Sequence, residues 1–126
     1  KETLSRVNPG KGFAEANLHR CAEAIEDLAE QVMLTEDEAI VAVLKGMSQR
    51  KDRNEEMRRF GIPELMIFGT GDNYIPVEAA EAMILAQPQA RTAWLERSGH
   101  MGFVEQPEES LAILKDFLTE VAGKGN

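Results

Sequence analysis

The stretch ELMIFGTGDNYIP, residues 64–76, joins a short apolar run to a loop rich in turn-forming residues. A continuous apolar run of this length, bounded by turn residues, is typical of a strand buried on both faces of a parallel sheet. Pro76 suits the first turn of a helix, which we expect to reach about Gln87. The stretch therefore predicts a strand, a loop and a helix in succession.

A second strand and a second helix follow the first pair. The run ARTAWLE, residues 90–96, alternates its side chains between two faces and predicts a strand. Pro107, with two glutamates after it, opens a last helix that we expect Gly123 to end. Strands joined by a helix in this way are parallel neighbours, and their connection is almost always right-handed. The predicted fold class is therefore α/β over residues 61–126.

The first sixty residues have a helical pattern instead. Residues 1–12 contain a proline and two glycines and predict a loop. From Phe13 to Val32, apolar residues recur at steps of three and four, which predicts an amphipathic helix. Thr35 with Glu38 is a capping-box signature and predicts the start of a second helix.

A short third helix is predicted over EEMRRF, residues 55–60, with Gly61 at its left-handed end. The chain is therefore divided into a helical region, residues 1–60, and an α/β region, residues 61–126. This division is an expectation from the change in pattern at about Pro63.

The composition excludes several classes of partner. Fourteen Lys and Arg face 22 Asp and Glu, the net charge is −8, and no basic cluster offers a track for nucleic acid. The apolar runs are far shorter than the roughly 20 residues of a membrane-spanning helix. The single cysteine, Cys21, has no internal disulfide partner and suits a reducing compartment, with the cytoplasm as the default. Its place on an apolar helical stripe predicts a buried core residue.

Asp72 and His100 each lie a few residues past a predicted strand. The carboxyl ends of parallel strands meet at one edge of a sheet, so we expect the two side chains within about 2.6 to 3.2 Å of each other. A carboxylate beside an imidazole fixes the tautomer of the ring and stabilises its protonated form. Gly99 is expected to leave space open around the imidazole. The pattern predicts a general-base pair.

Residues 62–76, IPELMIFGTGDNYIP, and residues 94–118, WLERSGHMGFVEQPEESLAILKDFL, resemble the carboxyl-terminal end of α/β-hydrolase-fold enzymes. In that family the catalytic acid follows one strand and the histidine follows the next. The resemblance implies that Asp72 is the acid and His100 the base of a Ser-His-Asp triad acting on an ester or related acyl bond. Residues 1–60 look like the end of the helical cap of such enzymes.

The nucleophile is missing from this pattern. The family's serine lies in a G-x-S-x-G elbow upstream of the acid, and the chain has no such pentapeptide. The nearest match, GMSQR around Ser48, has Arg50 in place of glycine, and only 24 residues separate Ser48 from Asp72. Ser98 is expected to bond the backbone of its own loop. The resemblance therefore implies a serine outside this chain and a chain that is inactive alone.

Two alternatives stay open. An aspartate nucleophile upstream of this chain would make the longer protein of which the chain is a part a haloalkane dehalogenase or an epoxide hydrolase that uses the same histidine. A non-catalytic ligand receptor could keep the same constellation as a binding pocket. An upstream G-x-S-x-G motif would support the esterase, and an upstream G-x-D-x-x motif would support the dehalogenase or epoxide hydrolase.

Further expectations concern the surroundings of the pair. Met101 and Phe103 are expected to line the acyl pocket, and Tyr74 either closes the cleft or anchors its loop. The partner is a small-molecule acyl substrate, and no cofactor or metal is implied. A two-stranded sheet is too small to be stable alone, so we also expect the chain to associate with itself.

Overall fold

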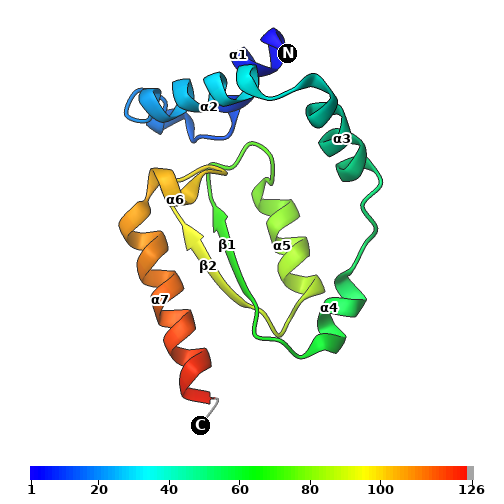
Figure 1. Cartoon of the computed structure of the whole chain (residues 1–126). Coiled ribbons are helices and arrows are strands. Elements are labelled where there is room, and N and C mark those ends of the chain that lie inside the picture. The colour runs from blue at the N-terminus through cyan, green and yellow to red at the C-terminus, as the bar shows by residue number, and fades with distance from the viewer. Residues whose placement is uncertain (125–126) are drawn as a thin grey trace.

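The computed structural model describes residues 1–124 and has many helices around a small parallel sheet (Figure 1). Strands β1 (Leu65–Gly69) and β2 (Arg91–Leu95) pair in parallel, with Leu65 opposite Arg91 and Gly69 opposite Leu95. The predicted α/β class is confirmed at this level. Because the two strands run in parallel and in register, the loops that follow them emerge at the same edge of the sheet.

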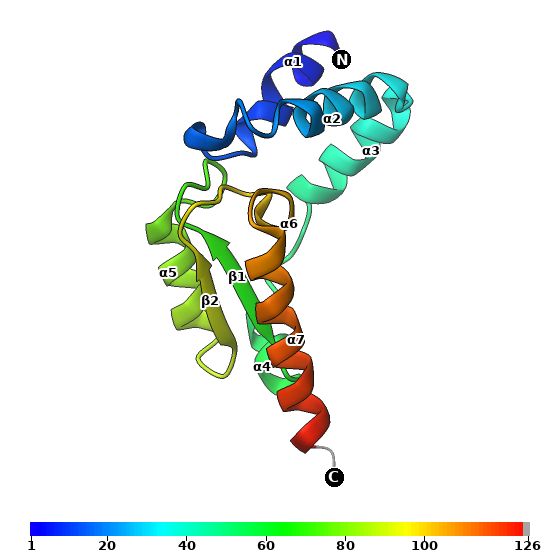
Figure 2. The same ribbon diagram turned by 90° about the vertical axis from the view of Figure 1, so that its left-hand side faces the viewer.

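Helices lie on both sides of this sheet. Helix α5 (Val77–Ala86) follows β1, while α6 (Gly102–Glu105) and α7 (Pro107–Lys124) follow β2. Figure 2 shows α5 and α7 on opposite sides of the strands. The last helix continues through Gly123 to Lys124, so the predicted end at this glycine is wrong.

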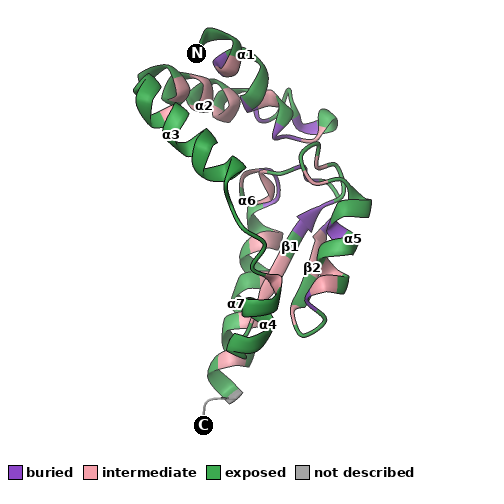
Figure 3. Ribbon diagram, turned by 90° about the vertical axis from the view of Figure 1, so that its right-hand side faces the viewer, coloured by how far each residue is buried: buried purple, intermediate pink, exposed green. Residues whose placement is uncertain are grey.

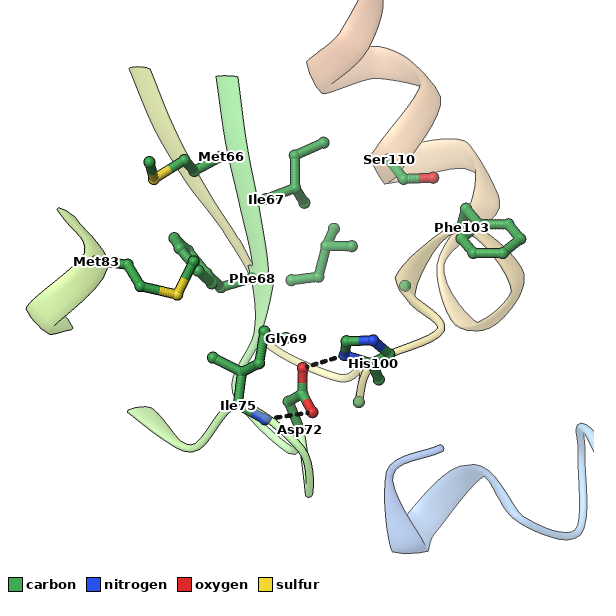
Figure 4. Close-up of a pocket in the computed structure, with 13 residues that line it drawn as sticks. Met66, Ile67, Phe68, Gly69, Asp72, Ile75, Met83, His100, Phe103 and Ser110 are labelled. Carbon is green, nitrogen blue, oxygen red and sulfur yellow. Dashed lines mark hydrogen bonds and ion pairs between the residues drawn. The ribbon is translucent and has the colours of Figure 1, made fainter. Parts of the chain in front are cut away.

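The prediction that β1 is buried on both faces is wrong for Ile67, a residue that is 38% exposed. Figure 4 shows Met66 and Phe68 on the side of α5, and Ile67 on the side of α6 and α7. This alternation is that of any strand. Ile67 instead lines a cavity that Phe103 of α6 and Ser110 of α7 also line.

The amino-terminal region contains α1 (Glu2–Lys11), a 3₁₀ turn (Glu15–Asn17), α2 (Ala22–Leu34), α3 (Asp37–Ser48) and α4 (Asn54–Phe60). The predicted loop at residues 1–12 is wrong, because residues 2–11 form a helix that packs against α2. Pro9 lies in the last turn of this helix. There the backbone amide of Gly12 donates to the carbonyl of Pro9, and that of Phe13 donates to the carbonyl of Gly10. The ring of Pro9 is buried.

Two details of the predicted helices differ from the structure, and a third agrees. Phe13 does not begin a helix but lies 1% exposed in the core before α2, which begins at Ala22. The capping box at Thr35 does not form, because its hydroxyl donates to the carbonyl of Gln31 at 2.7 Å and closes α2. Gly61 has a φ of 61° and ends α4 in the predicted left-handed conformation.

The core lies where the strands end. Helices α1 and α2 lie beyond the carboxyl ends of the strands (Figures 1 and 2), and Figure 3 shows buried residues concentrated at this junction. The predicted core position of Cys21 is confirmed by an exposure of 5%. No helix within residues 1–124 has the length and apolar character to cross a membrane. The amino-terminal region therefore packs against the two loops that carry Asp72 and His100.

Candidate active site

Asp72 and His100 meet at the carboxyl edge of the sheet. Nδ1 of His100 lies 2.8 Å from Oδ2 of Asp72 (Figure 4), within the distance expected from the sequence. The Asp72 side chain is 6% exposed, whereas that of His100 is 45% exposed. Among the described residues, Nε2 of His100 has no hydrogen-bond partner. The pair therefore has a fixed buried acid and an accessible imidazole nitrogen.

The second oxygen of Asp72 is held by its own loop. Oδ1 accepts hydrogen bonds from the backbone amides of Tyr74 at 2.7 Å and Ile75 at 3.0 Å. Burial of the carboxyl acts to raise its pKa, but the hydrogen bonds from Ile75, His100 and Tyr74 outweigh burial, and the pKa of Asp72 lies below its ordinary value. Asp72 is therefore ionised and oriented, as a partner for the imidazole must be.

The loop of His100 is attached to the segment after α1. The backbone amides of His100 and Met101 both donate to the carbonyl of Gly12, at 2.8 and 3.1 Å. A Cβ on Gly99 would lie 2.6 Å from the nitrogen of Ala14. The space left by the missing side chain of Gly99 is thus filled by backbone, and the expectation that it opens room for the imidazole is wrong.

Tyr74 anchors its loop, which is one of the two roles considered for it, and it also lines the smaller of two cavities that His100 lines. Its hydroxyl donates to the carbonyl of Asn8 at 3.2 Å, and its ring meets the His100 ring edge-on with centroids 5.2 Å apart. The ring of Tyr74 therefore supports one side of the imidazole.

The two residues expected to line an acyl pocket lie in different cavities. Phe103 lines a mostly apolar cavity of about 330 Å³ beside β1, together with Asp72 and His100. Met101 lines one of about 220 Å³ that lies against α1 and α2, again with His100 on its wall. His100 is therefore shared by two apolar cavities, and each of the two residues marks one of them.

None of the chain's four serines bonds His100. Ser48, at the end of α3, donates to the carbonyl of Lys45, and Ser5 and Ser110 likewise donate to carbonyls three residues earlier. Ser98 is fully buried and donates to Oε1 of Gln106 at 2.8 Å, so the expected bond to its own backbone is wrong. Each hydroxyl is already used within the fold.

Sequence reasoning missed Glu105, which is 2% exposed and lies in α6. Its carboxylate accepts from Gly99, the residue before His100, and from two groups near the amino terminus. A glutamate shortly before Pro107 has the pattern of an ordinary acidic residue at the start of a helix. No sequence motif distinguishes it as a functional residue. Among residues 1–124, no group of three His, Cys, Asp or Glu side chains is arranged to hold a metal ion.

Known proteins resemble parts of this chain. A proline iminopeptidase from Heyndrickxia coagulans is 31% identical over 70 residues, which are 56% of this chain and 24% of that protein. A pimeloyl-[acyl-carrier protein] methyl ester esterase from Aromatoleum aromaticum is 35% identical over 54 residues, which are 43% of this chain and 22% of that protein. No family model matches the sequence.

A solved structure extends the likeness to nearly the whole chain. A thermophilic esterase from Thermogutta terrifontis, studied with malate bound, superposes with a TM-score of 0.80 and 26% identity, over 95% of this chain and 47% of that one. The chain thus spans about a quarter of the length of the curated relatives and about half of the solved esterase.

Proposed function

Because this chain belongs to the α/β-hydrolase superfamily, as its sequence predicted, we propose that it is the carboxyl-terminal part of a hydrolase that cleaves an ester or a related acyl bond. The observation that carries the proposal is the hydrogen bond between His100 and the buried Asp72. It leaves Nε2 as the exposed nitrogen of an oriented imidazole. In this proposal, residues 1–60 are the end of a cap and residues 61–126 belong to the hydrolase core.

The proposed reaction uses a serine from polypeptide outside these residues. Nε2 of His100 takes the proton of that hydroxyl as its oxygen attacks the acyl carbonyl. The imidazolium, stabilised by Asp72, then gives the proton to the leaving alcohol as the acyl–oxygen bond breaks. Water repeats the sequence on the acyl-serine and releases the acid. Met101 and Phe103 are proposed to contact the acyl and leaving groups, one in each cavity.

The names of the relatives favour acyl chemistry over the alternatives. Two are called esterases and one a peptidase, and both words describe cleavage at a carbonyl. Dehalogenase or epoxide hydrolase chemistry would need an aspartate nucleophile in place of the serine, and a receptor would bind without turnover.

Covalent labelling tests this proposal directly. A fluorophosphonate probe, which phosphonylates activated serines, is applied to the complete protein and the adduct is mapped by mass spectrometry. We expect the adduct on a serine outside this chain, and we expect Asp72→Asn to slow labelling by roughly 10⁴-fold, as in other triads. No adduct, together with a trapped ester on an aspartate, would replace the proposal with the dehalogenase or epoxide hydrolase class.

The 126-residue chain itself is expected to show no enzymatic turnover. With nitrophenyl acetate its rate should match the slow background of a free imidazole, because loss of a nucleophile costs on the order of 10⁶ in turnover. His100→Ala measures that background, and Ser48→Ala is the matched serine control. Saturable turnover that Ser48→Ala abolishes would contradict the assignment of an external nucleophile.

A further inference from the structure

We propose that Glu105 is a positioning residue that holds His100 against Asp72 by joining the histidine loop to residues 12–17. The proposal deepens the function proposed above and takes its catalytic meaning from it. The Glu105 carboxylate has no hydrogen bond to the side chain of either member of the pair. It acts through the backbone on which His100 is carried.

The carboxylate of Glu105 has hydrogen bonds on both oxygens. Oε1 accepts from the backbone amide of Ala14 at 2.7 Å and from Nδ2 of Asn17 at 2.8 Å. Oε2 accepts from the backbone amide of Gly99 at 2.7 Å. One buried side chain therefore connects the histidine loop with a segment that lies more than 80 residues earlier in the chain.

Neighbouring polar groups complete this cluster. Nη2 of Arg20 donates to the carbonyl of Glu105 at 2.8 Å and to Oδ1 of Asn17 at 3.0 Å, so it turns the amide of Asn17 toward the carboxylate. Nδ2 of Asn17 also donates to the carbonyl of Arg97 at 2.6 Å. The same short segment thus holds the histidine loop on both sides of Gly99.

These contacts determine where the imidazole lies. Gly99 donates to Glu105, and the next two amides, of His100 and Met101, donate to Gly12. The ring itself is 45% exposed and has a single hydrogen bond, the one to Asp72. That bond and the edge-on contact with Tyr74 hold the ring. The fixed backbone of three consecutive residues therefore determines whether the imidazole lies within reach of Asp72.

The site requires a carboxylate of this length. All three donors are N–H groups, and a glutamine would direct its own NH₂ at one of them and leave a buried donor unpaired. An aspartate keeps the charge but is one methylene shorter and cannot reach both Gly99 and Ala14. Glu105→Gln and Glu105→Asp should therefore fail in the same way for different reasons.

The test measures the tautomer of His100 by nitrogen-15 NMR on the full 126-residue chain near pH 8, where an ordinary histidine is neutral. In the unmodified chain, the Asp72 contact should hold the proton on Nδ1. In Glu105→Gln and Glu105→Asp, the ring should shift toward the mixture of free histidine, and the carboxyl of Asp72 should titrate at higher pH. Glu109→Gln is the matched control, because Glu109 lies in the adjacent helix, bonds Arg97 and Gln106, and has no hydrogen bond to residues 12–17.

A role in stability alone would lower the unfolding midpoint and leave the tautomer unchanged. Folded Glu105 variants that keep the Nδ1–H form and the Asp72 titration of the unmodified chain would overturn the proposal. If both variants fail to fold, hydrogen exchange on the unmodified chain decides. The amides of Gly99 and Ala14 should then exchange at one common rate, about tenfold or more below that of an exposed amide.

Exchange of the Gly99 amide at the rate of an open loop would contradict the proposed positioning role of Glu105. None of these measurements uses turnover. A failure of the hydrolase assignment would appear in the labelling experiment, and a failure of the positioning role would appear here.

Discussion

The two carboxylate oxygens of Asp72 have different partners. Oδ1 is bound by the amides of its own loop, and this leaves Oδ2 in one place for the imidazole. A carboxylate free to rotate would have to be ordered each time the imidazole took a proton. The loop of Asp72 provides that order in the resting protein, which is the sense in which such a site is preorganised.

The lowered pKa of Asp72 makes a prediction about stability and pH. A carboxyl with a depressed folded pKa stabilises the fold above its unfolded pKa, 3.8 in the reference state, and the contribution is lost as the pH falls through the folded value. Asp72→Asn should therefore lower the free energy of unfolding by about 1 to 3 kcal/mol at pH 6. The difference from the unmodified chain should shrink toward pH 3.

Urea titrations at both pH values measure this difference. Asp116→Asn, at an exposed position on α7, is the control and should have little effect at pH 6. A difference that grows as the pH falls would contradict the assigned sign.

Gly99 supports a prediction about close packing. The Cβ of Gly99→Ala would lie 2.6 Å from the nitrogen of Ala14 and 2.8 Å from the carbonyl carbon of Phe13, both of them backbone atoms. The loop must move to admit the methyl group, and we expect a loss of about 1 to 3 kcal/mol in stability. The chemical shifts of the His100 ring should move as well.

Gly46→Ala is the matched control for Gly99→Ala. Gly46 lies inside α3 with nothing within 4 Å of its added Cβ, so alanine there should stabilise the chain by roughly 0.5 to 1 kcal/mol. Equal effects of the two substitutions would show that the backbone contact at Gly99 carries no weight.

At the scale of elements, the α/β half was the more predictable from sequence. A short apolar run ending in turn residues has few other solutions, and β1 lies within a residue of its expected position. The acid and the histidine follow from where the strands end. Glu105 does not, because its partners are backbone amides and one asparagine far away in the chain, and no local pattern encodes them.

The amino-terminal half was less predictable because local signals there compete. A proline and two glycines favour a loop, yet packing against α2 keeps residues 2–11 helical. The hydroxyl of Thr35 can cap the helix on either side of it, and it closes α2 instead of opening α3. Tertiary contacts decide such cases, and a single sequence does not contain them in readable form.

The end of α4 gives a prediction at this scale. Gly61 has a φ of 61°, a backbone conformation that costs free energy in residues with a Cβ. Gly61→Ala should lose about 1 kcal/mol of stability, and Gly61→Asn less, because asparagine tolerates the left-handed region. A Cβ at Gly61 would meet nothing within 4 Å, so no steric clash competes with this explanation. Thermal unfolding of both variants measures the two losses, and an equal loss would contradict the role of the backbone angle.

At the scale of the whole molecule, the exposed surface is large for the mass. The chain exposes 9202 Å², whereas a compact monomer of 14.0 kDa exposes about 6,700 Å², an excess of about 2,500 Å². Exposed apolar residues on the strand and on the last helix contribute to it, among them Ile67, Leu111, Leu114 and Leu118. Surface of this kind is normally covered.

The excess supports the prediction that the isolated chain associates with itself. Sedimentation velocity at micromolar concentration should give a dimer or larger species that dissociates on dilution. Ile67→Glu would place a charge on the exposed face of β1 and should weaken association at least tenfold if that face is buried between copies. A well-folded monomer at these concentrations would contradict the prediction.

The bonds of Glu105 also bear on the order in which the chain folds. Helices α1 and α2 are neighbours in sequence and can pair soon after synthesis, since local contacts close short loops. The hydrogen bonds from Ala14 and Asn17 to Glu105 span 91 and 88 residues, so they form only after β1, β2 and α6 have all been made. We therefore expect the histidine to reach its final place among the last events of folding, when Glu105 meets residues 14–17.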